Sequence, residues 1–336
     1  MKILTININK GGTGKTTLSH NLAEYLAKDN RVLLMDFDDS CNLTGRYNVT
    51  PKEENTIISL FDKEYVEPIN VRENLDLICS YYGVDLLKER QNGRRRREYT
   101  LGKWIAKNHE KLSGNYDYII IDTENDEAIL TINALIVSDV VLGIAEPSKD
   151  AVEALIKLKY FVNDLNSDFD SETKLFYLGN RINFSENMSK DFIEALERKE
   201  EYLGYIPRRT LIGDDIAVFN NPKVDKKLKK EILGGKVMKK LLGLLALTVA
   251  VSAVASADQD VLKSINATTE IRQGWTDQSG TSKGKGNKLG NEGFKKANKT
   301  DTKWRNVVKG ELKLVDEWDL DASFKVLHDN DNSRGK

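Results

Sequence analysis

Residues Asn9–Thr17, which read Asn-Lys-Gly-Gly-Thr-Gly-Lys-Thr-Thr, form the segment with the clearest capacity for chemistry. An apolar run precedes them and an amphipathic run follows, so the segment should connect a strand to a helix. Glycines allow successive backbone N–H groups to point inward around phosphate oxygens, and the start of a helix adds a favourable dipole. The residues expected to bind the phosphates of a nucleotide are Gly11, Gly12, Thr13, Gly14, Lys15, Thr16 and Thr17.

Two side chains of this loop have separate expected roles. Lys15 should reach the β- and γ-phosphates, and the Thr16 hydroxyl should ligate Mg²⁺. A strict phosphate-binding loop has glycine where this sequence has Asn9, and an additional lysine, Lys10, follows it. The alternative is a glycine-rich turn that binds nothing, but a strand, a loop, a Lys-Thr pair and a helix coincide here.

The elements that would position this loop alternate along residues 1–220. Strand-like runs without polar alternation, as expected for strands buried on both faces, are Ile3–Ile8, Arg31–Met35, Leu75–Cys79, Tyr118–Ile121, Val140–Ala145 and Leu175–Leu178. Helix-like segments between them are Thr16–Lys28, Glu127–Val137, Asp150–Asn163 and Ser185–Lys199. This order predicts an α/β fold, a doubly wound and mostly parallel sheet with helices on both faces.

The composition excludes several classes of protein. Fifty-one basic and 52 acidic residues give a net charge of −1, so no global field attracts a polyanion. The two cysteines, Cys41 and Cys79, cannot form a disulfide framework, and the three histidines offer no metal-ligand spacing. Met1 leads directly into a strand-like run, so we expect no N-terminal signal peptide and a reduced, cytoplasmic setting.

Three stretches together resemble a known family. The pattern Lys-Gly-Gly-x-Gly-Lys-Thr-Thr is similar to the deviant Walker A box of the ParA/MinD family of dimeric P-loop ATPases. Val32–Thr44 resembles the second box of that family, and Tyr116–Thr123 resembles its Walker B strand. Gly179-Asn180 and Gly204–Arg208 resemble later landmarks. The resemblance covers residues 1–235.

The resemblance implies roles for particular residues. Lys10 matches the signature lysine that crosses the dimer interface to the partner's nucleotide, and with Lys15 and Asp38 it makes up the implied catalytic set. Asp38 matches the residue that orients the attacking water, and it is a further candidate ligand for magnesium. Asp122 matches the carboxylate that holds Mg²⁺ through water, at a strand end where doubly wound sheets bind ligands. Two later positions, Asn180 and Pro207, are implied to contact the nucleotide.

Two departures from the family pattern fall in its switch segments. Asp39-Ser40 replaces Pro-Gln after Asp38, and Glu124-Asn125 replaces two prolines after Asp122-Thr123. The expectation of ATP and Mg²⁺ binding therefore does not extend to the rate of hydrolysis or its control by a partner. The alternative role for Asp36 or Asp38 is that of a solvated loop acid that caps a helix.

The implied function is that of a ParA-type ATPase. Asn42 and Thr44 favour this type over MinD. Such a protein dimerises on ATP, hydrolyses it slowly to ADP and phosphate, and acts in plasmid or chromosome partitioning through non-specific DNA and a stimulating, ParB-like partner. The implied location is the cytoplasm, in association with the nucleoid. The alternatives are a MinD-like ATPase on a membrane surface and a non-hydrolysing nucleotide switch or scaffold.

Two basic clusters are candidates for contacts with DNA phosphates: Arg94–Arg97 and Lys223–Lys230. Binding through such clusters should weaken steeply with salt, because each neutralised phosphate releases counterions. The alternative for each cluster is a solvated helix face.

The sequence changes character after about residue 235. Residues 236–257 combine a lysine-rich stretch with the uncharged run Leu241–Ala257, and from Met238 this layout resembles a secretory signal peptide. Residues 258–336 form a polar, β-rich or disordered tail. Its alternating runs, Ile265–Trp275 and Glu311–Leu327, resemble the start of an outer-membrane β-barrel protein, although 79 residues are too few to close one. The alternatives for Leu241–Ala257 are a signal-anchor, which would associate the protein with a membrane, and a buried core helix.

Overall fold

The computed structural model describes residues 1–209, 212, 216–218, 220–224, 240, 241 and 243, and the backbone of residues 268–276, 303–312 and 322–330. The chain divides into two units, Met1–Leu245 and Ala246–Lys336. The first unit contains every residue of the expected phosphate-binding loop and both expected acidic segments.

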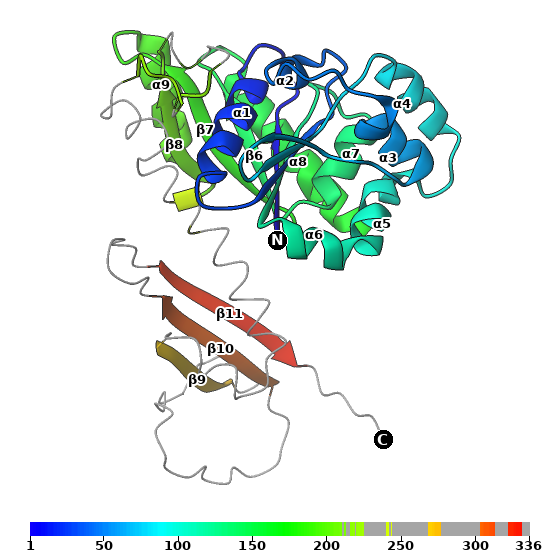
Figure 1. Cartoon of the computed structure of the whole chain (residues 1–336). Helices are drawn as coiled ribbons and strands as arrows, with labels where there is room; N and C mark the ends of the chain where they lie inside the picture. Colours follow the sequence, from blue (N-terminus) through cyan, green and yellow to red (C-terminus); the bar gives the residue numbers. More distant parts are fainter. Residues whose placement is uncertain are drawn as a thin grey trace, which may run out of the picture. The chain divides into compact units, whose positions relative to one another are not determined.

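An eight-stranded sheet forms the centre of the first unit (Figure 1). Its strands are β1 Lys2–Asn7, β2 Val32–Asp36, β3 Ile69–Arg72, β4 Leu75–Ile78, β5 Tyr118–Asp122, β6 Val140–Ala145, β7 Lys174–Ile182 and β8 Tyr202–Pro207. They lie in the order β3-β4-β2-β5-β1-β6-β7-β8. The edge strand β3 pairs antiparallel with β4, and the other neighbouring pairs are parallel. The predicted doubly wound, mostly parallel sheet is confirmed.

Helices connect these strands. They are α1 Lys15–Leu26, α2 Asn42–Gly45, α3 Ile57–Lys63, α4 Val84–Asn92, α5 Thr100–Lys107, α6 His109–Asn115, α7 Ile129–Ile136, α8 Ala151–Phe169 and α9 Asn187–Glu197, with 3-10 turns at Glu53–Asn55 and Arg97–Tyr99. Helix α7 packs on α4, α5 and α8, whereas α1 packs on α2 and on strands β1, β2 and β5. The helices thus form layers on both sides of the sheet (Figure 1).

The central strands β1, β2, β5 and β6 are largely apolar without alternation because both of their faces are buried. Successive side chains of a strand point to opposite faces, and the core divides accordingly. Leu4, Leu34 and Ile120 pack in one cluster with Leu18 and Leu22 of α1. Their sequence neighbours belong to a second cluster with residues of α3–α7; these neighbours are Ile3, Leu33, Met35, Ile119 and Ile121.

The strand order places the ends of three strands side by side. In β1 and β5 the paired residues include Ile6 with Asp122, and in β2 and β5 they include Asp36 with Asp122. The loop after β1 and the acidic segments after β2 and β5 therefore emerge together at the carboxyl edge of the sheet, where doubly wound folds bind ligands.

The second unit contains a three-stranded antiparallel sheet. Its strands are β9 Thr268–Thr276, β10 Lys303–Leu312 and β11 Ala322–Asn330, in the order β11-β10-β9. The alternating run Ile265–Trp275 overlaps β9, whereas the run Glu311–Leu327 overlaps the end of β10 and the start of β11. Two sequence features fall largely outside the described residues: the lysine cluster at 223–230 and the apolar run at 241–257. No helix within the described residues has the length and apolarity needed to cross a bilayer.

Candidate functional site

The loop between β1 and α1 has the backbone geometry of a phosphate cradle. Gly12 and Gly14 adopt positive φ angles of 76° and 96°, a region that glycine enters without steric cost. The helix begins directly afterwards, where the Leu18 amide donates to the Gly14 carbonyl at 2.9 Å. The first amides of α1 thus lie beside the loop, where helix N-termini bind anions.

Lys15 is buried at the start of α1. Its Nζ donates to the carbonyl oxygen of Ile8 at 3.4 Å, so the side chain returns to the beginning of its own loop. Burial lowers the pKa of Lys15, and the carboxylates of Asp122 and Asp38 oppose this effect. A buried lysine that forms no direct ion pair within the described residues is suited to receive a phosphate group.

Asp122 lies at the end of β5 and is fully buried. The Ser19 hydroxyl donates to its Oδ1 atom at 2.8 Å, whereas its Oδ2 atom has no hydrogen-bond partner in the described part of the chain. Burial raises the pKa of Asp122 to about 6, and the hydroxyls of Thr16 and Ser19 act in the opposite direction. A buried carboxyl group that interacts with the Thr16 hydroxyl and has one oxygen unpaired within the described residues fits a hydrated Mg²⁺ ion.

A polar bridge fixes the ends of β1 and β5. Asn7 donates from Nδ2 to the Thr123 hydroxyl at 2.7 Å, and this hydroxyl donates to the Ile6 carbonyl at 2.9 Å. Both side chains are buried. The sequence patterns did not predict this pair, although Asn7, a polar residue inside the apolar run Ile3–Ile8, is a usable signal.

Asp36 and Asp38 have different environments. Asp36 is fully buried, and its Oδ2 atom accepts hydrogen bonds from the Thr44 amide at 2.8 Å and the Thr44 hydroxyl at 2.7 Å. Burial, followed by repulsion from Asp122, raises the pKa of Asp36 to about 7. Asp36 therefore holds α2 in place and is not a solvated loop acid. Asp38 is half-buried, and its Oδ1 atom accepts from the Ser40 amide at 2.9 Å.

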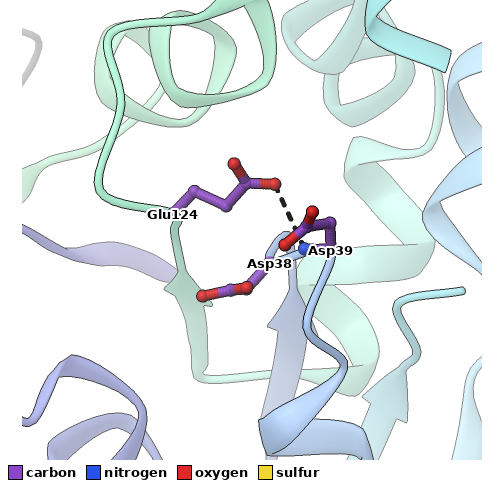
Figure 2. A group of neighbouring side chains, drawn as sticks. All are labelled: Asp38, Asp39 and Glu124. Atoms are coloured by element: carbon purple, nitrogen blue, oxygen red, sulfur yellow. Dashed lines mark hydrogen bonds between the residues drawn. The ribbon is translucent and has the colours of Figure 1, made fainter. Parts of the chain in front are cut away.

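Glu124 joins the two switch segments, as Figure 2 shows. Its Oε1 atom accepts a hydrogen bond from the Asp39 amide at 3.1 Å. One carboxylate oxygen from each of Asp38, Asp39 and Glu124 lies within 4.8 Å of the others. In the sequence, Glu124 is a departure from the family pattern, but the pattern does not predict the cation that pairs with it.

The cation that pairs with Glu124 is Lys88 of α4. Its Nζ contacts Glu124 Oε2 at 2.5 Å and Asp126 Oδ2 at 3.0 Å. Burial acts to lower the pKa of Lys88, but the hydrogen bonds to Glu124 and Asp126 outweigh it and raise the pKa to about 12. Lys88 is therefore a cation at neutral pH, and it partly neutralises the acidic cluster.

A cavity of about 500 Å³ adjoins the phosphate loop. Gly14 and Thr17 line one side of it, and Asn180 and Pro207 line the other. Asn180 is buried and donates from Nδ2 to the Thr13 carbonyl at 2.8 Å. The structure thus brings both later landmark residues to the loop, although they lie more than 160 positions away in the sequence.

Lys10 lies apart from this cavity. Its Nζ donates to the Ser148 hydroxyl at 2.7 Å, in the loop between β6 and α8. It lines a separate cavity of about 460 Å³ with Asn9, Asp150 and Lys157. The side chain of Lys10 is therefore held by a residue of its own chain.

The arginine run 94–97 divides into two pairs. Arg94 donates to the Phe61 carbonyl at 2.7 Å and contacts Asp62, and Arg97 donates to the Asn92 carbonyl at 2.9 Å. Arg95 and Arg96 are exposed and form no ion pair within the described residues. Two of the four arginines, Arg94 and Arg97, are thus held by neighbouring residues.

A glycine-rich loop, a buried lysine, an unpaired carboxylate and an adjoining cavity, all on a doubly wound sheet, define a P-loop nucleotide-binding protein. A family model described as an AAA domain matches residues 1–175. The chain is 31% identical to the sporulation initiation inhibitor protein Soj of Bacillus subtilis over 226 residues, which cover 63% of this chain and 87% of Soj. It is also 31% identical to the virulence plasmid ParA family protein pGP5-D of Chlamydia psittaci over 209 residues, 58% of this chain and 76% of that protein.

A solved structure agrees with these relatives. A plasmid partition protein from Borrelia burgdorferi, bound to AMPPNP, superposes with a TM-score of 0.62 at 29% identity, over 72% of this chain and 98% of that one. The chain belongs to the ParA family.

Proposed function

We propose that this protein is an ATPase that acts in plasmid or chromosome partitioning. The observation that carries the proposal is the meeting of Lys15, the unpaired Oδ2 atom of Asp122 and the Asn180 cavity at one edge of the sheet. ATP is the favoured nucleotide because the similar Borrelia protein was solved with an ATP analogue.

The chain's own residues supply binding and charge neutralisation. Lys15 lies where it can neutralise phosphate charge, and the loop amides around Gly12 and Gly14 can donate to phosphate oxygens. Thr16 and Asp122 would hold Mg²⁺, which when bound neutralises charge on the phosphates. Asp38 would orient the attacking water, provided that its carboxylate leaves the Ser40 amide.

Dimerisation and DNA binding complete the proposed cycle. Lys10 would exchange its contact with Ser148 for the nucleotide of a second copy of the chain. Arg95 and Arg96, together with lysines of the 223–230 cluster, would bind DNA phosphates without sequence preference. A ParB-like protein would stimulate turnover. The cycle would take place in the cytoplasm, on the nucleoid.

Titration calorimetry with ATP and Mg²⁺ tests the proposal. We expect Lys15→Ala to abolish ATP binding, because it removes the buried cation of the loop. Lys103→Ala, at an exposed position of α5, removes the same charge and is the matched control. Equal ATP affinity in the wild type and Lys15→Ala contradicts the proposal.

A non-hydrolysing nucleotide switch is the second candidate. The Ser40 amide and hydroxyl both contact Asp38 Oδ1, and so they compete with a water molecule for the proposed catalytic carboxylate. Tight ATP binding without phosphate release would select this function. The membrane-surface alternative and the signal-like interpretation of residues 238–257 depend on residues outside the described part, and they stay predictions.

A further inference from the structure

After β2, the Phe37 amide donates to the Asp122 carbonyl at 2.9 Å, and a second hydrogen bond to a distant segment follows at the position where the family pattern is altered. Within the described residues, the backbone hydrogen bonds of residues 38–40 otherwise remain local. Asp38 N–H donates to Asp36, Ser40 N–H donates to Asp38, and the Asp38 carbonyl accepts from Cys41. The exception is the Asp39 amide, which donates to Glu124 Oε1 at 3.1 Å (Figure 2).

Glu124 is itself held firmly at both ends. Its backbone follows Thr123, whose hydroxyl is bonded to β1 through Asn7 and Ile6. Its other carboxylate oxygen is bound by Lys88 of α4, and the side chains of Lys88 and Glu124 are only 15% and 14% exposed. Low exposure reduces screening by solvent, so this ion pair restrains Glu124 more than a surface pair would.

We infer that Glu124 is a positioning residue for ATP hydrolysis. Fixed by Lys88, its carboxylate holds the Asp39 amide and thereby sets the place of the neighbouring Asp38 at the carboxyl edge of the sheet. The inference rests on the proposed ATPase function. It gives the altered switch segment a role, because a proline at position 124 would provide no side-chain acceptor for the Asp39 amide.

This role makes a specific demand on residue 124. The Asp39 amide needs an acceptor at that place. A glutamine retains one acceptor oxygen of similar reach for this amide but gives up the ion pair with Lys88, whereas an alanine retains neither contact. Loss of the acceptor would free residues 38–40 to move relative to Asp122. A small misplacement of a catalytic group lowers the rate of the chemical step without weakening the contacts between the loop and the phosphates.

The experiment compares the full-length wild type with Glu124→Gln, Glu124→Ala and the control Glu194→Gln. The control removes the same charge from an exposed glutamate that is paired with Arg198 on α9. Steady-state phosphate release gives kcat and KM, calorimetry gives ATP affinity, and amide hydrogen exchange measures protection at Asp39. We expect Glu124→Ala to lower kcat about tenfold, with KM and ATP affinity within about threefold of the wild type.

The conservative variant separates positioning from general destabilisation. We expect Glu124→Gln to lie between the wild type and Glu124→Ala in kcat and in exchange protection at Asp39, because it keeps an acceptor for the Asp39 amide but loses the ion pair with Lys88. Glu194→Gln should match the wild type. Wild-type kcat in Glu124→Ala overturns the inference, as does an equal loss in Glu124→Gln and Glu124→Ala. A wild type that binds ATP but releases no phosphate overturns the inference and leaves ATP binding intact. A wild type that does not bind ATP overturns the proposed function as well.

Discussion

Asn180 lies so close to Gly14 that a Cβ atom added to this glycine would stand 2.5 Å from Asn180 Nδ2. The same Nδ2 atom donates to the Thr13 carbonyl at 2.8 Å. The end of β7 therefore supports the phosphate loop directly, and one side chain forms both the wall of the adjoining cavity and the brace of the loop. Changes at either residue should affect nucleotide binding.

Gly14→Ala should weaken both stability and ATP binding. Its φ of 96° disfavours any residue with a Cβ atom, at a cost of about 1–2 kcal/mol, and the new methyl group would displace Asn180. We expect a lower urea midpoint and at least a tenfold loss of ATP affinity by calorimetry, which corresponds to about 1.4 kcal/mol. Gly114→Ala, in helix α6 with no atom within 4 Å of the added Cβ, is the matched control and should not destabilise the protein. Unchanged ATP affinity in Gly14→Ala would contradict the role of Asn180 as a brace.

Arg95 and Arg96, the exposed residues of the arginine run, should contribute to the proposed DNA binding. Arg95→Gln combined with Arg96→Asn removes two charges, and asparagine tolerates the positive φ of 56° at position 96. Each phosphate contact contributes about 0.9 to the slope of log affinity against log salt, so we expect the slope to fall by about 2. Fluorescence anisotropy with duplex DNA and ATP at several salt concentrations measures it. Arg198→Gln, at the exposed residue that follows α9, is the control and should leave the slope unchanged. An unchanged slope in the double variant would assign Arg95 and Arg96 to the solvated surface.

The sequence predicted the centre of the fold well because buried parallel strands are short and uniformly apolar. The run Val140–Ala145 coincides with β6, and five other runs match strands within a few residues at each end. The prediction omitted β3, β8 and the short helices between residues 42 and 115. Strand β3 is an edge strand with alternating burial, and helices of four to nine residues carry too few turns for a clear period.

The candidate site was predictable where one motif contains the whole feature. The loop from Gly11 to Thr17 is of this kind, since its residues are consecutive and its helix follows directly. The bridge between Lys88 and Glu124 was not predictable, because its partners lie 36 residues apart on elements whose pairing depends on the fold. The resemblance to the family predicted that Asp122, Asn180 and Pro207 belong to the nucleotide site, and their individual roles stay predictions.

His20 should make the first unit sensitive to acid. It is buried on α1, with Arg46, Arg72, Tyr47 and Glu24 around it. Burial, followed by repulsion from Arg46 and Arg72, lowers the pKa of His20 to about 3. The unfolded chain takes up a proton as the pH falls through about 6.5, whereas the folded chain does so only near pH 3. Stability is therefore lost between these values, by about 2 kcal/mol at pH 5.

Urea unfolding at pH 7 and pH 5 measures this effect. Glutamine does not titrate, so His20→Gln should lose about 2 kcal/mol less than the wild type between the two pH values. Glu24 is present in both proteins, so its own titration contributes to both. His109→Gln, at the exposed start of α6, is the control and should keep the wild-type dependence. An identical pH dependence in His20→Gln would show that the histidine is not kept neutral by the fold.

Asp122→Asn should stabilise the folded protein and reduce the effect of magnesium on its ATP affinity. Burial raises the pKa of Asp122 to about 6, whereas the unfolded chain ionises at about 3.9, so folding stability is lost as the pH rises between these values, and the full loss of about 3 kcal/mol is present at pH 8. The asparagine retains an acceptor for the Ser19 hydroxyl but carries no charge. We expect the variant without nucleotide to melt at a higher temperature than the wild type at pH 8, and magnesium to improve its ATP affinity no more than about twofold, because a neutral amide is a weak partner for a hydrated Mg²⁺ ion. Ser19→Ala removes the hydrogen bond and keeps the carboxylate, and so it should retain the full effect of magnesium. If Asp122→Asn responds to magnesium as the wild type does, the metal is held by other residues, and the unpaired oxygen at the end of β5 has a different use.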